Sequence, residues 1–197
     1  MSPQAREAHS ANATSKRLLA LALKDLLKER EYPDVSVSDI VTRCGVARRT
    51  LYNHFKDKED LVAWIYETEV LSRLRVPARD TWADNIYDSI HDMYEDRDFY
   101  TKVFSAADPA THWGHRMEFA VYAFCSVIER YLDGRSLPAA TEKYIAQFYA
   151  IGYVNTLLTW VQNGMKETPE YLTQRLVDMV DNGIYYAVDH AGDLYKG

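Results

Sequence analysis

The sequence predicts an all-α protein with a small N-terminal domain and a larger helical C-terminal domain. Apolar residues recur at helical spacing along most of the chain, and no alternating, strand-like run follows about residue 82. Dipeptides that break helices separate the periodic segments: Asp108-Pro109, Asp133-Gly134, Asn163-Gly164, Thr168-Pro169 and Asn182-Gly183. We therefore predict one domain over residues 1–60 and a second over residues 61–197, which begins with a linking helix.

The composition is that of a globular protein that stays inside the cell. Of the 197 residues, 47% are apolar and 26% are charged, which is ordinary for a folded domain. No apolar run reaches 18 residues, and residues 1–13 lack the apolar core of a signal peptide. Cys44 and Cys125 fall on apolar helical faces, which predicts buried free thiols. We expect a cytoplasmic protein with no membrane segment.

Charge is distributed unevenly along the chain, whose net charge is −6. Residues 1–60 hold 11 Lys/Arg and 9 Asp/Glu, a net +2, whereas residues 61–197 hold 12 and 20, a net −8. Within residues 42–58, only Asp57 opposes five basic side chains: Arg43, Arg48, Arg49, Lys56 and Lys58. This asymmetry favours a small surface that binds a phosphate backbone, carried on an acidic body.

The first predicted helix packs through leucine-rich rows. Residues 1–13 are polar and without periodicity, so we expect a mobile arm. Thr14 or Ser15 can cap a helix that continues to about Glu31, with two adjacent apolar rows, Leu18/Ala22/Leu26 and Leu19/Leu23/Leu27. Tyr32-Pro33 ends this helix, because the residue before a proline avoids the helical region.

Residues 36–58 have the pattern of two short helices joined by a glycine turn. Ser36 and Asp39 form a variant of the capping box. An apolar face follows, and Gly45 supplies the left-handed residue that stops the first helix; that face is formed by Val37, Ile40, Val41 and Cys44. A second helix over about 48–54 turns Ala47, Leu51 and Phe55 inward. The pattern predicts a helix-turn-helix that places its second helix in a major groove.

The outward face of the second helix carries the chemistry of DNA recognition. Arg can read guanine edges or grip phosphate, Asn can pair with adenine, and Thr can touch a thymine methyl. Tyr and Lys are more often phosphate anchors, which set register. A basic, solvated surface helix is the alternative interpretation. We assign contacts with double-stranded DNA to Ser38, Arg48, Arg49, Thr50, Tyr52, Asn53, His54 and Lys58.

The linking helix follows directly. Asp57 is expected to cap it, and Glu59 and Asp60 suit the positive end of its dipole. Lys58 is unfavourable at that end, and an incoming phosphate would explain its presence. The helix is predicted to continue to about Leu74.

These segments resemble the tetracycline-repressor (TetR) family of regulators. The resemblance rests on residues 36–41, on Cys44-Gly45-Val46 and above all on the run from Thr50 to Leu61, TLYNHFKDKEDL. The family usually has Ser or Thr where this chain has Ala47, so the recognition helix lacks a side-chain cap, which typically costs about 1 kcal/mol. Weaker similarity extends into the C-terminal domain, at Asp98-Phe99-Tyr100 with Phe104 and between Phe148 and Pro169.

The C-terminal domain is predicted to contain helices near 82–95, 97–106, 112–132, 138–163 and 169–181, the last with a possible extension to 190. Tyrosines and histidines are frequent in it, and their polar groups need partners when buried. Core or interface packing is the ordinary role of each such residue. A cavity between helices 82–132 and 138–163 for an aromatic or amphipathic molecule is the alternative, lined by Tyr87, His91, Tyr94, Trp113, Tyr122 and Tyr153.

Other site chemistry has little support. His112, His115 and Glu118 lack the spacing of a metal centre, and we expect no metal or cofactor. No nucleophile, phosphate-loop or dinucleotide motif indicates an enzyme. The resemblance implies a homodimer formed by the last two long helices, most simply a repressor released from an inverted-repeat operator by a small-molecule effector. A co-regulator that acts mainly through protein–protein contacts is the alternative function.

Overall fold

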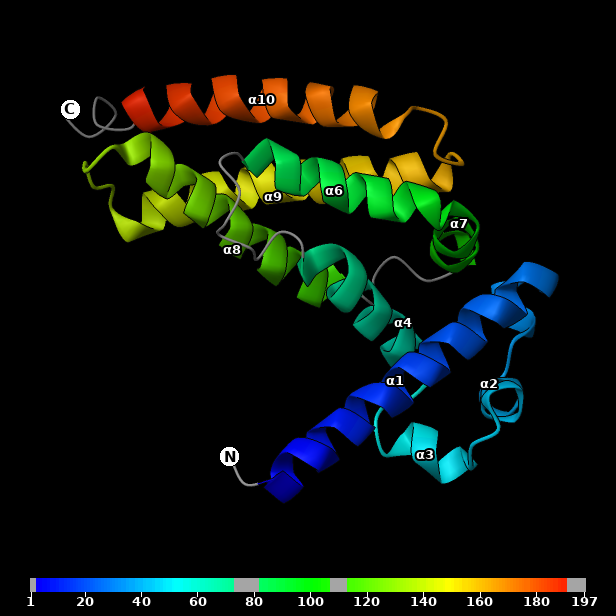
Figure 1. Ribbon diagram of the computed structural model, residues 1–197. Helices are drawn as coiled ribbons and strands as arrows, with labels where there is room; N and C mark the ends of the chain where they lie inside the picture. The colour runs from blue at the N-terminus through cyan, green and yellow to red at the C-terminus, as the bar shows by residue number, and fades with distance from the viewer. Residues whose placement is uncertain (1–2, 73–81, 107–112, 191–197) are drawn as a thin grey trace.

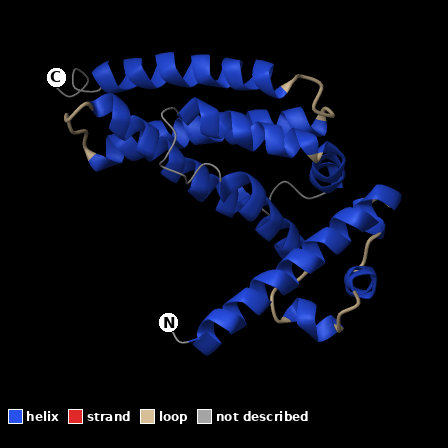
Figure 2. Cartoon of the chain, viewed as in Figure 1, coloured by secondary structure: helices blue, strands red, loops and turns tan. Residues whose placement is uncertain are grey.

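The computed structural model describes residues 3–72, 82–106 and 113–190, and all regular structure in these ranges is helical (Figure 2). The all-α prediction is therefore confirmed. Predictions that fall on residues 73–81 and 107–112, including the end of the linking helix at Leu74, lie outside the described residues. Within the described ranges no helix is both long enough and apolar enough to cross a bilayer.

The N-terminal domain, which we call the head, consists of α1 (Pro3–Glu29), the 3-10 turn η1 (Tyr32–Asp34), α2 (Val37–Cys44) and α3 (Arg48–Tyr52). Both α2 and α3 lie on one side of α1 (Figure 1). Leucines of α1 meet Ile40 and Leu51 in a fully buried core. The head thus follows the predicted arrangement, in which the leucine rows of the first helix support the helix-turn-helix.

The predicted start of α1 was wrong, and its end lies two residues before the approximate limit predicted at Glu31. The helix begins at Pro3, so most of residues 1–13 continue α1 instead of forming an irregular arm. Alanine, glutamine, glutamate and arginine are good helix formers, so this segment can be helical without an apolar stripe in its sequence. At the other end α1 stops at Glu29, and Pro33 lies in the first turn of η1. Leu18 is exposed, so the buried stripe is narrower than predicted.

The linking helix changes its hydrogen-bonding pattern partway along. It begins as α4 (Lys58–Tyr66) and continues as the π-helical segment η2 (Glu67–Leu71). A uniform α-helix had been predicted here, because a π turn leaves no mark in the apolar period. Such turns are rare and occur frequently at functional sites.

The C-terminal domain, which we call the body, contains α6 (Trp82–Glu95), α7 (Arg97–Ala106), α8 (Trp113–Leu132), α9 (Ala139–Gln162) and α10 (Pro169–His190). Helix α8 packs along α9, and α10 packs on α6 and α8 (Figure 1). The first four helices agree with their predicted limits to within one residue. Cys44 and Cys125 are free thiols but only half-buried, so their predicted full burial was wrong.

Helix α10 continues through Asn182-Gly183, which had been predicted as a breaker. Ile184 and Val188 keep the buried face of the helix beyond that point. Gly183 lies against the hydroxyl of Tyr149 on α9, where a Cβ would collide with it. Gly183 therefore allows α9 and α10 to approach closely. Its low helix propensity, which costs up to about 1 kcal/mol relative to alanine, is tolerated.

Candidate nucleic-acid interface

Local capping chemistry builds the helix-turn-helix. Ser36 Oγ accepts a hydrogen bond from the Asp39 N–H at 3.2 Å, and the Asp39 carboxylate accepts one from the Ser36 N–H at 2.8 Å. The hydrogen bonds from Ser36 lower the pKa of Asp39 to about 2. Gly45 ends α2 with a left-handed φ of 69°, which glycine adopts without steric cost. Both predicted signals are confirmed, and they set the direction in which the chain enters α3.

Helix α3 separates its two faces as predicted for Leu51 and Phe55, although it is shorter, and Ala47, which was predicted to face inward, is exposed. Leu51 and Phe55 are buried in the head. Thr50 and His54 are half-buried at the margins, and the exposed side chains are Arg48, Arg49, Tyr52 and Asn53. The helix ends at Tyr52 and not at His54, because the N–H groups of His54 and Phe55 both bond to the Leu51 carbonyl. Ala47 provides no side-chain cap.

One residue of the exposed face is held in place before any DNA arrives. The guanidinium of Arg48 donates to the Tyr52 hydroxyl at 3.2 Å and lies 3.5 Å from Ser38 Oγ. It also lies 5.6 Å from the centre of the Tyr52 ring, within range of a cation–π interaction. Arg48 and Tyr52 come from α3 and Ser38 from α2, so these three residues connect the two helices of the motif.

Two of the five basic side chains counted in residues 42–58 are engaged inside the head. Lys58 Nζ donates to the carbonyls of Tyr32 and Val35, both at 2.9 Å. Arg43 pairs with Asp25 and, at 3.1 Å, with Glu29. The carbonyls around η1 therefore account for Lys58 at this position without a phosphate. Arg48, Arg49 and Lys56 remain as exposed cations.

Three residues predicted to line an effector cavity pack between helices instead. Tyr87 and His91 stack with ring centres 5.6 Å apart, and the Tyr87 hydroxyl donates to Glu170 of α10 at 3.0 Å. Tyr94 stacks on Trp160 of α9 at 6.2 Å. These contacts use one side of α6 to join it to α9 and α10, which is the packing role that the sequence analysis left open.

Two further predicted residues do not support the cavity. Tyr122 is 66% exposed, so its predicted inward orientation was wrong: it lies on the face of α8 opposite the buried Phe124 and Ile128. The side chain of Trp113 lies outside the described part of the chain. His112 and the side chain of His115 do as well, and the described residues contain no cluster of three His, Cys, Asp or Glu that could hold a metal ion.

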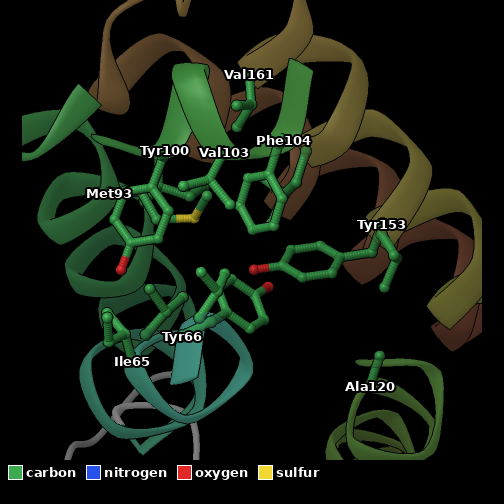
Figure 3. Packing of buried hydrophobic residues seen from close by; sticks show 14 of the residues in the cluster. Ile65, Tyr66, Met93, Tyr100, Val103, Phe104, Ala120, Tyr153 and Val161 are labelled. Atoms are coloured by element: carbon green, nitrogen blue, oxygen red, sulfur yellow. The ribbon is translucent and has the colours of Figure 1, made fainter. Parts of the chain in front are cut away.

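Among the predicted cavity residues whose side chains are described, Tyr153 places its hydroxyl in the buried core of the body, close to a small cavity that it does not itself line. Its side chain is 6% exposed, and its buried hydroxyl has no hydrogen-bond partner, although Ser89 lies beside it. Figure 3 shows this hydroxyl directed toward Tyr66. A nearby cavity of about 20 Å³ is large enough for one water molecule and is lined by Tyr66, Met93, Phe104, Val154, Leu157, Leu158 and Val161. It lies between α4, α6, α7 and α9.

The sequence analysis missed the ionic contact between head and body. Lys24 of α1 reaches Glu69 of η2 and Asp96 between α6 and α7, at 2.6 and 2.5 Å. From the other side, Lys102 of α7 donates to the carbonyls of Leu27 and Arg30. These partners lie 45 to 75 residues apart in sequence, so no local pattern could have revealed them.

Comparison with known proteins agrees with this architecture. Residues 18–65 match the family of bacterial regulatory proteins named tetR, and residues 80–182 match a TetR-type family described as transcriptional regulator C-terminal region. A curated relative is the HTH-type dhaKLM operon transcriptional activator DhaS of Lactococcus lactis subsp. lactis (strain IL1403), 30% identical over 91 residues. That match covers 46% of this chain and about half, 49%, of the relative.

Solved structures share the fold. The dihydroxyacetone kinase operon activator DhaS has a TM-score of 0.61 at 21% identity and covers 86% of this chain and 96% of its own. A TetR regulator from Streptococcus agalactiae 2603V has a TM-score of 0.59 at 20% identity, with 89% and 98% covered. Because the C-terminal match alone covers 103 of the 197 residues, in addition to the N-terminal one, this chain belongs to the TetR family of DNA-binding transcriptional regulators.

Proposed function

We propose that this chain is a homodimeric repressor that binds an inverted-repeat operator through α3 and is released from it by a small molecule. The observation that carries the proposal is the outward face of α3, where Arg48 is held by Tyr52 and Ser38. A prepositioned guanidinium loses less side-chain entropy on binding, so it suits bidentate reading of guanine. The basic face also disfavours the alternative of a co-regulator that acts only through proteins.

The proposed DNA contacts divide by chemistry. Arg48 and Asn53 are assigned to base edges, whereas Arg49, Tyr52 and the half-buried Thr50 and His54 are assigned mainly to the backbone. Ser38 acts by holding Arg48. Lys58 keeps a secondary role, because two of the three donors of its ammonium already meet carbonyls.

Dimerisation is proposed through the exposed faces of α9 and α10. Tyr144, Phe148 and Ile151 form an exposed stripe at helical spacing on α9, and Met179 and Tyr186 continue it on α10. The contact between Tyr149 and Gly183 brings the two helices together, which supports a shared interface formed by both stripes. Large apolar patches of this kind mark interaction sites, and a two-fold pairing buries both copies of the patch.

Control by a small molecule is proposed at Tyr153. An unpaired, fully buried hydroxyl carries a desolvation cost of about 1–3 kcal/mol, which a ligand with a hydrogen-bond acceptor would relieve. The adjoining cavity of about 20 Å³ is small, so an effector of ordinary size must move α4, α6, α7 or α9 on entry. Because α4 adjoins the head, such a movement would favour the conformation that does not bind DNA.

Selection from random duplex DNA with the purified protein tests the proposal. We expect an inverted repeat whose half-sites lie about one helical turn, 34–36 Å, apart or a multiple of it. Arg48→Ala and Asn53→Ala should each weaken the selected site by about 1–3 kcal/mol and relax preference at one base pair. Arg130→Ala, at an exposed position of α8, is the matched control and should leave affinity unchanged.

Light scattering at micromolar concentration tests the dimer. Wild-type protein should be dimeric, and Phe148→Glu or Met179→Glu should yield folded monomers, because each places a charge in the proposed apolar contact. A monomeric wild-type protein would refute the dimer.

Transcriptional activation is the second candidate function, favoured by the name of the Lactococcus relative. A reporter gene placed downstream of the selected site distinguishes activation from repression.

A further inference from the structure

Two lysines cross the boundary between head and body in opposite directions. Lys24 extends from α1 to the body, where its Nζ lies 2.6 Å from Glu69 Oε2 and 2.5 Å from Asp96 Oδ2. Lys102 extends from α7 to the C-terminal end of α1, where its Nζ lies 2.8 Å from the Leu27 carbonyl oxygen and 3.2 Å from Glu31. The head is therefore attached to the body at two neighbouring points on one rigid helix.

The Lys24 contact is built more firmly than a surface ion pair. The lysine side chain is only 18% exposed, so salt screens its interactions less than those of a free surface charge. Its ammonium also lies 5.1 Å from the centre of the Phe99 ring. Charge-assisted hydrogen bonds at such short distances are among the strongest in proteins. Lys28, one turn further along α1, pairs with Asp25 of its own helix at 3.7 Å and is largely exposed.

The acids that receive Lys24 lie outside the head, in η2 of the linking helix and at the corner between α6 and α7 of the body. Glu69 lies in the π-helical segment η2 and also accepts a hydrogen bond from the buried Tyr100 at 3.3 Å. In the same segment the Val70 carbonyl accepts a bond from Ser89 of α6 at 3.4 Å. Asp96 lies at the corner between α6 and α7. Any movement of α6 or α7 therefore reaches Lys24 through polar contacts.

One side of α1 is not closely packed against the body at this boundary. A hollow of about 240 Å³ lies beside the contact, and its walls include Lys24, Lys28, Asp96, Arg97 and Phe99. A side of α1 that faces open space can tilt unless a directional contact prevents it. The two lysine contacts provide that restraint.

The DNA-binding end of the head lies at a distance from the two lysine contacts, measured along α1. Lys16 of α1, whose ammonium lies 5.3 Å from the centre of the Phe55 ring beyond α3, is eight residues from Lys24. Eight helical residues span about 12 Å. Helix α3 lies beside the N-terminal half of α1, away from the lysine contacts (Figure 1). A small rotation of α1 about Lys24 would therefore displace α3 by a larger distance than the residues beside Lys24.

We propose that Lys24 is a positioning residue that fixes the angle of the head on the body and thereby the spacing of half-sites that the dimer accepts. The inference rests on the proposed dimeric operator binding. Lys24 does not touch DNA in this proposal. It determines where α3 lies relative to its partner copy, and so selects among operators that share the same half-site sequence.

The test uses the full-length protein and a library in which the half-sites selected by the wild type are separated by spacers of every length over two helical turns. Wild type should prefer one spacer strongly. Lys24→Met should keep the half-site sequence but reduce the preference for the best spacer over its neighbours by roughly tenfold. Lys24→Arg should restore it, and Lys28→Met, the matched control, should behave as wild type.

Each outcome has a separate meaning. A general loss of stability would weaken binding to all spacers in proportion, so the shape of the spacer profile isolates the positioning role. If Lys24→Met fails to fold, Glu69→Gln and Asp96→Asn provide a second test, because each removes one of the two carboxylates that pair with Lys24 and both positions are more exposed than Lys24. Each should broaden the spacer profile partially. An unchanged profile in folded variants overturns the inference. Failure of wild type to select an inverted repeat overturns the proposed function instead.

Discussion

The head and the body satisfy their polar groups in different ways. In the head, Ser36, Asp57, Lys58 and Arg43 all bond to backbone or charged partners within the domain. In the described part of the body, three buried side-chain atoms have no hydrogen-bond partner: His91 Nδ1, Tyr153 Oη and Thr173 Oγ1. Exposed aromatic residues are also concentrated on α8, α9 and α10. The polar groups named in the head are therefore satisfied within the domain, whereas the body carries polar atoms and exposed aromatic side chains that could bind a ligand or a second chain.

This difference matches the two tasks proposed for the molecule. Reading base edges requires side chains fixed to within a fraction of an ångström, and capping and carbonyl contacts supply that rigidity. A body that responds to an effector and pairs with a second copy needs surface and polar groups that are not yet used. Three changes, described from the largest expected effect to the smallest, would break or sharpen the comparison.

Removing the internal lysine of the head should have the largest effect on stability. Lys58→Met leaves the Val35 carbonyl without its donor and removes one of the two donors of the Tyr32 carbonyl, and we expect a loss of about 1–3 kcal/mol, the usual cost of one abandoned buried acceptor. Urea denaturation measures it. Lys56→Met, at an exposed position two residues earlier, should change stability by less than about 0.5 kcal/mol. Equal midpoints for both variants would show that Lys58 serves DNA and not the fold.

A change at the α9–α10 crossing should test how tightly the body is packed. Gly183→Ala improves helix propensity by about 0.5–1 kcal/mol but places a Cβ against the hydroxyl of Tyr149. We expect the single variant to be near neutral. Tyr149→Phe removes the opposing oxygen, so the double variant should gain most of the helix benefit, with a coupling of about 1 kcal/mol in a double-mutant cycle. Additive effects would mean that Tyr149 moves aside freely.

The smallest expected effect is the loss of stability at low pH that comes from Asp39 of the capping box. Because hydrogen bonds from Ser36 hold the pKa of Asp39 at about 2, Asp39 stabilises the folded head above pH 4. This contribution is lost as the pH falls from about 4 to about 2. In Ser36→Ala the pKa of Asp39 should rise toward the value of about 3.9 for a free aspartate, as a carboxyl NMR titration would show. A pKa that stays near 2 would assign the shift to the backbone N–H of residue 36, which alanine keeps, and to Arg30.

The sequence by itself determined the helix-turn-helix. The Ser36–Asp39 box, the turn at Gly45, the cap at Asp57 and the two faces of α3 are all encoded within four or five neighbouring residues, and short-range hydrogen bonds and helical periodicity do not depend on the rest of the chain. The limits of α6 to α9 followed from the same kind of signal. So did the missing cap at Ala47.

Only the tertiary structure decided where side chains find distant partners. Lys58 and Arg43 found partners within the head, Tyr122 faced outward, α10 continued through Gly183, and Lys24 met two acids outside the head. Periodicity assigns a residue to a face of its helix, but the packing of helices far apart in sequence determines what that face meets. The ionic contact between head and body, on which the proposed spacing of half-sites depends, is therefore a property of the fold that no segment encodes alone.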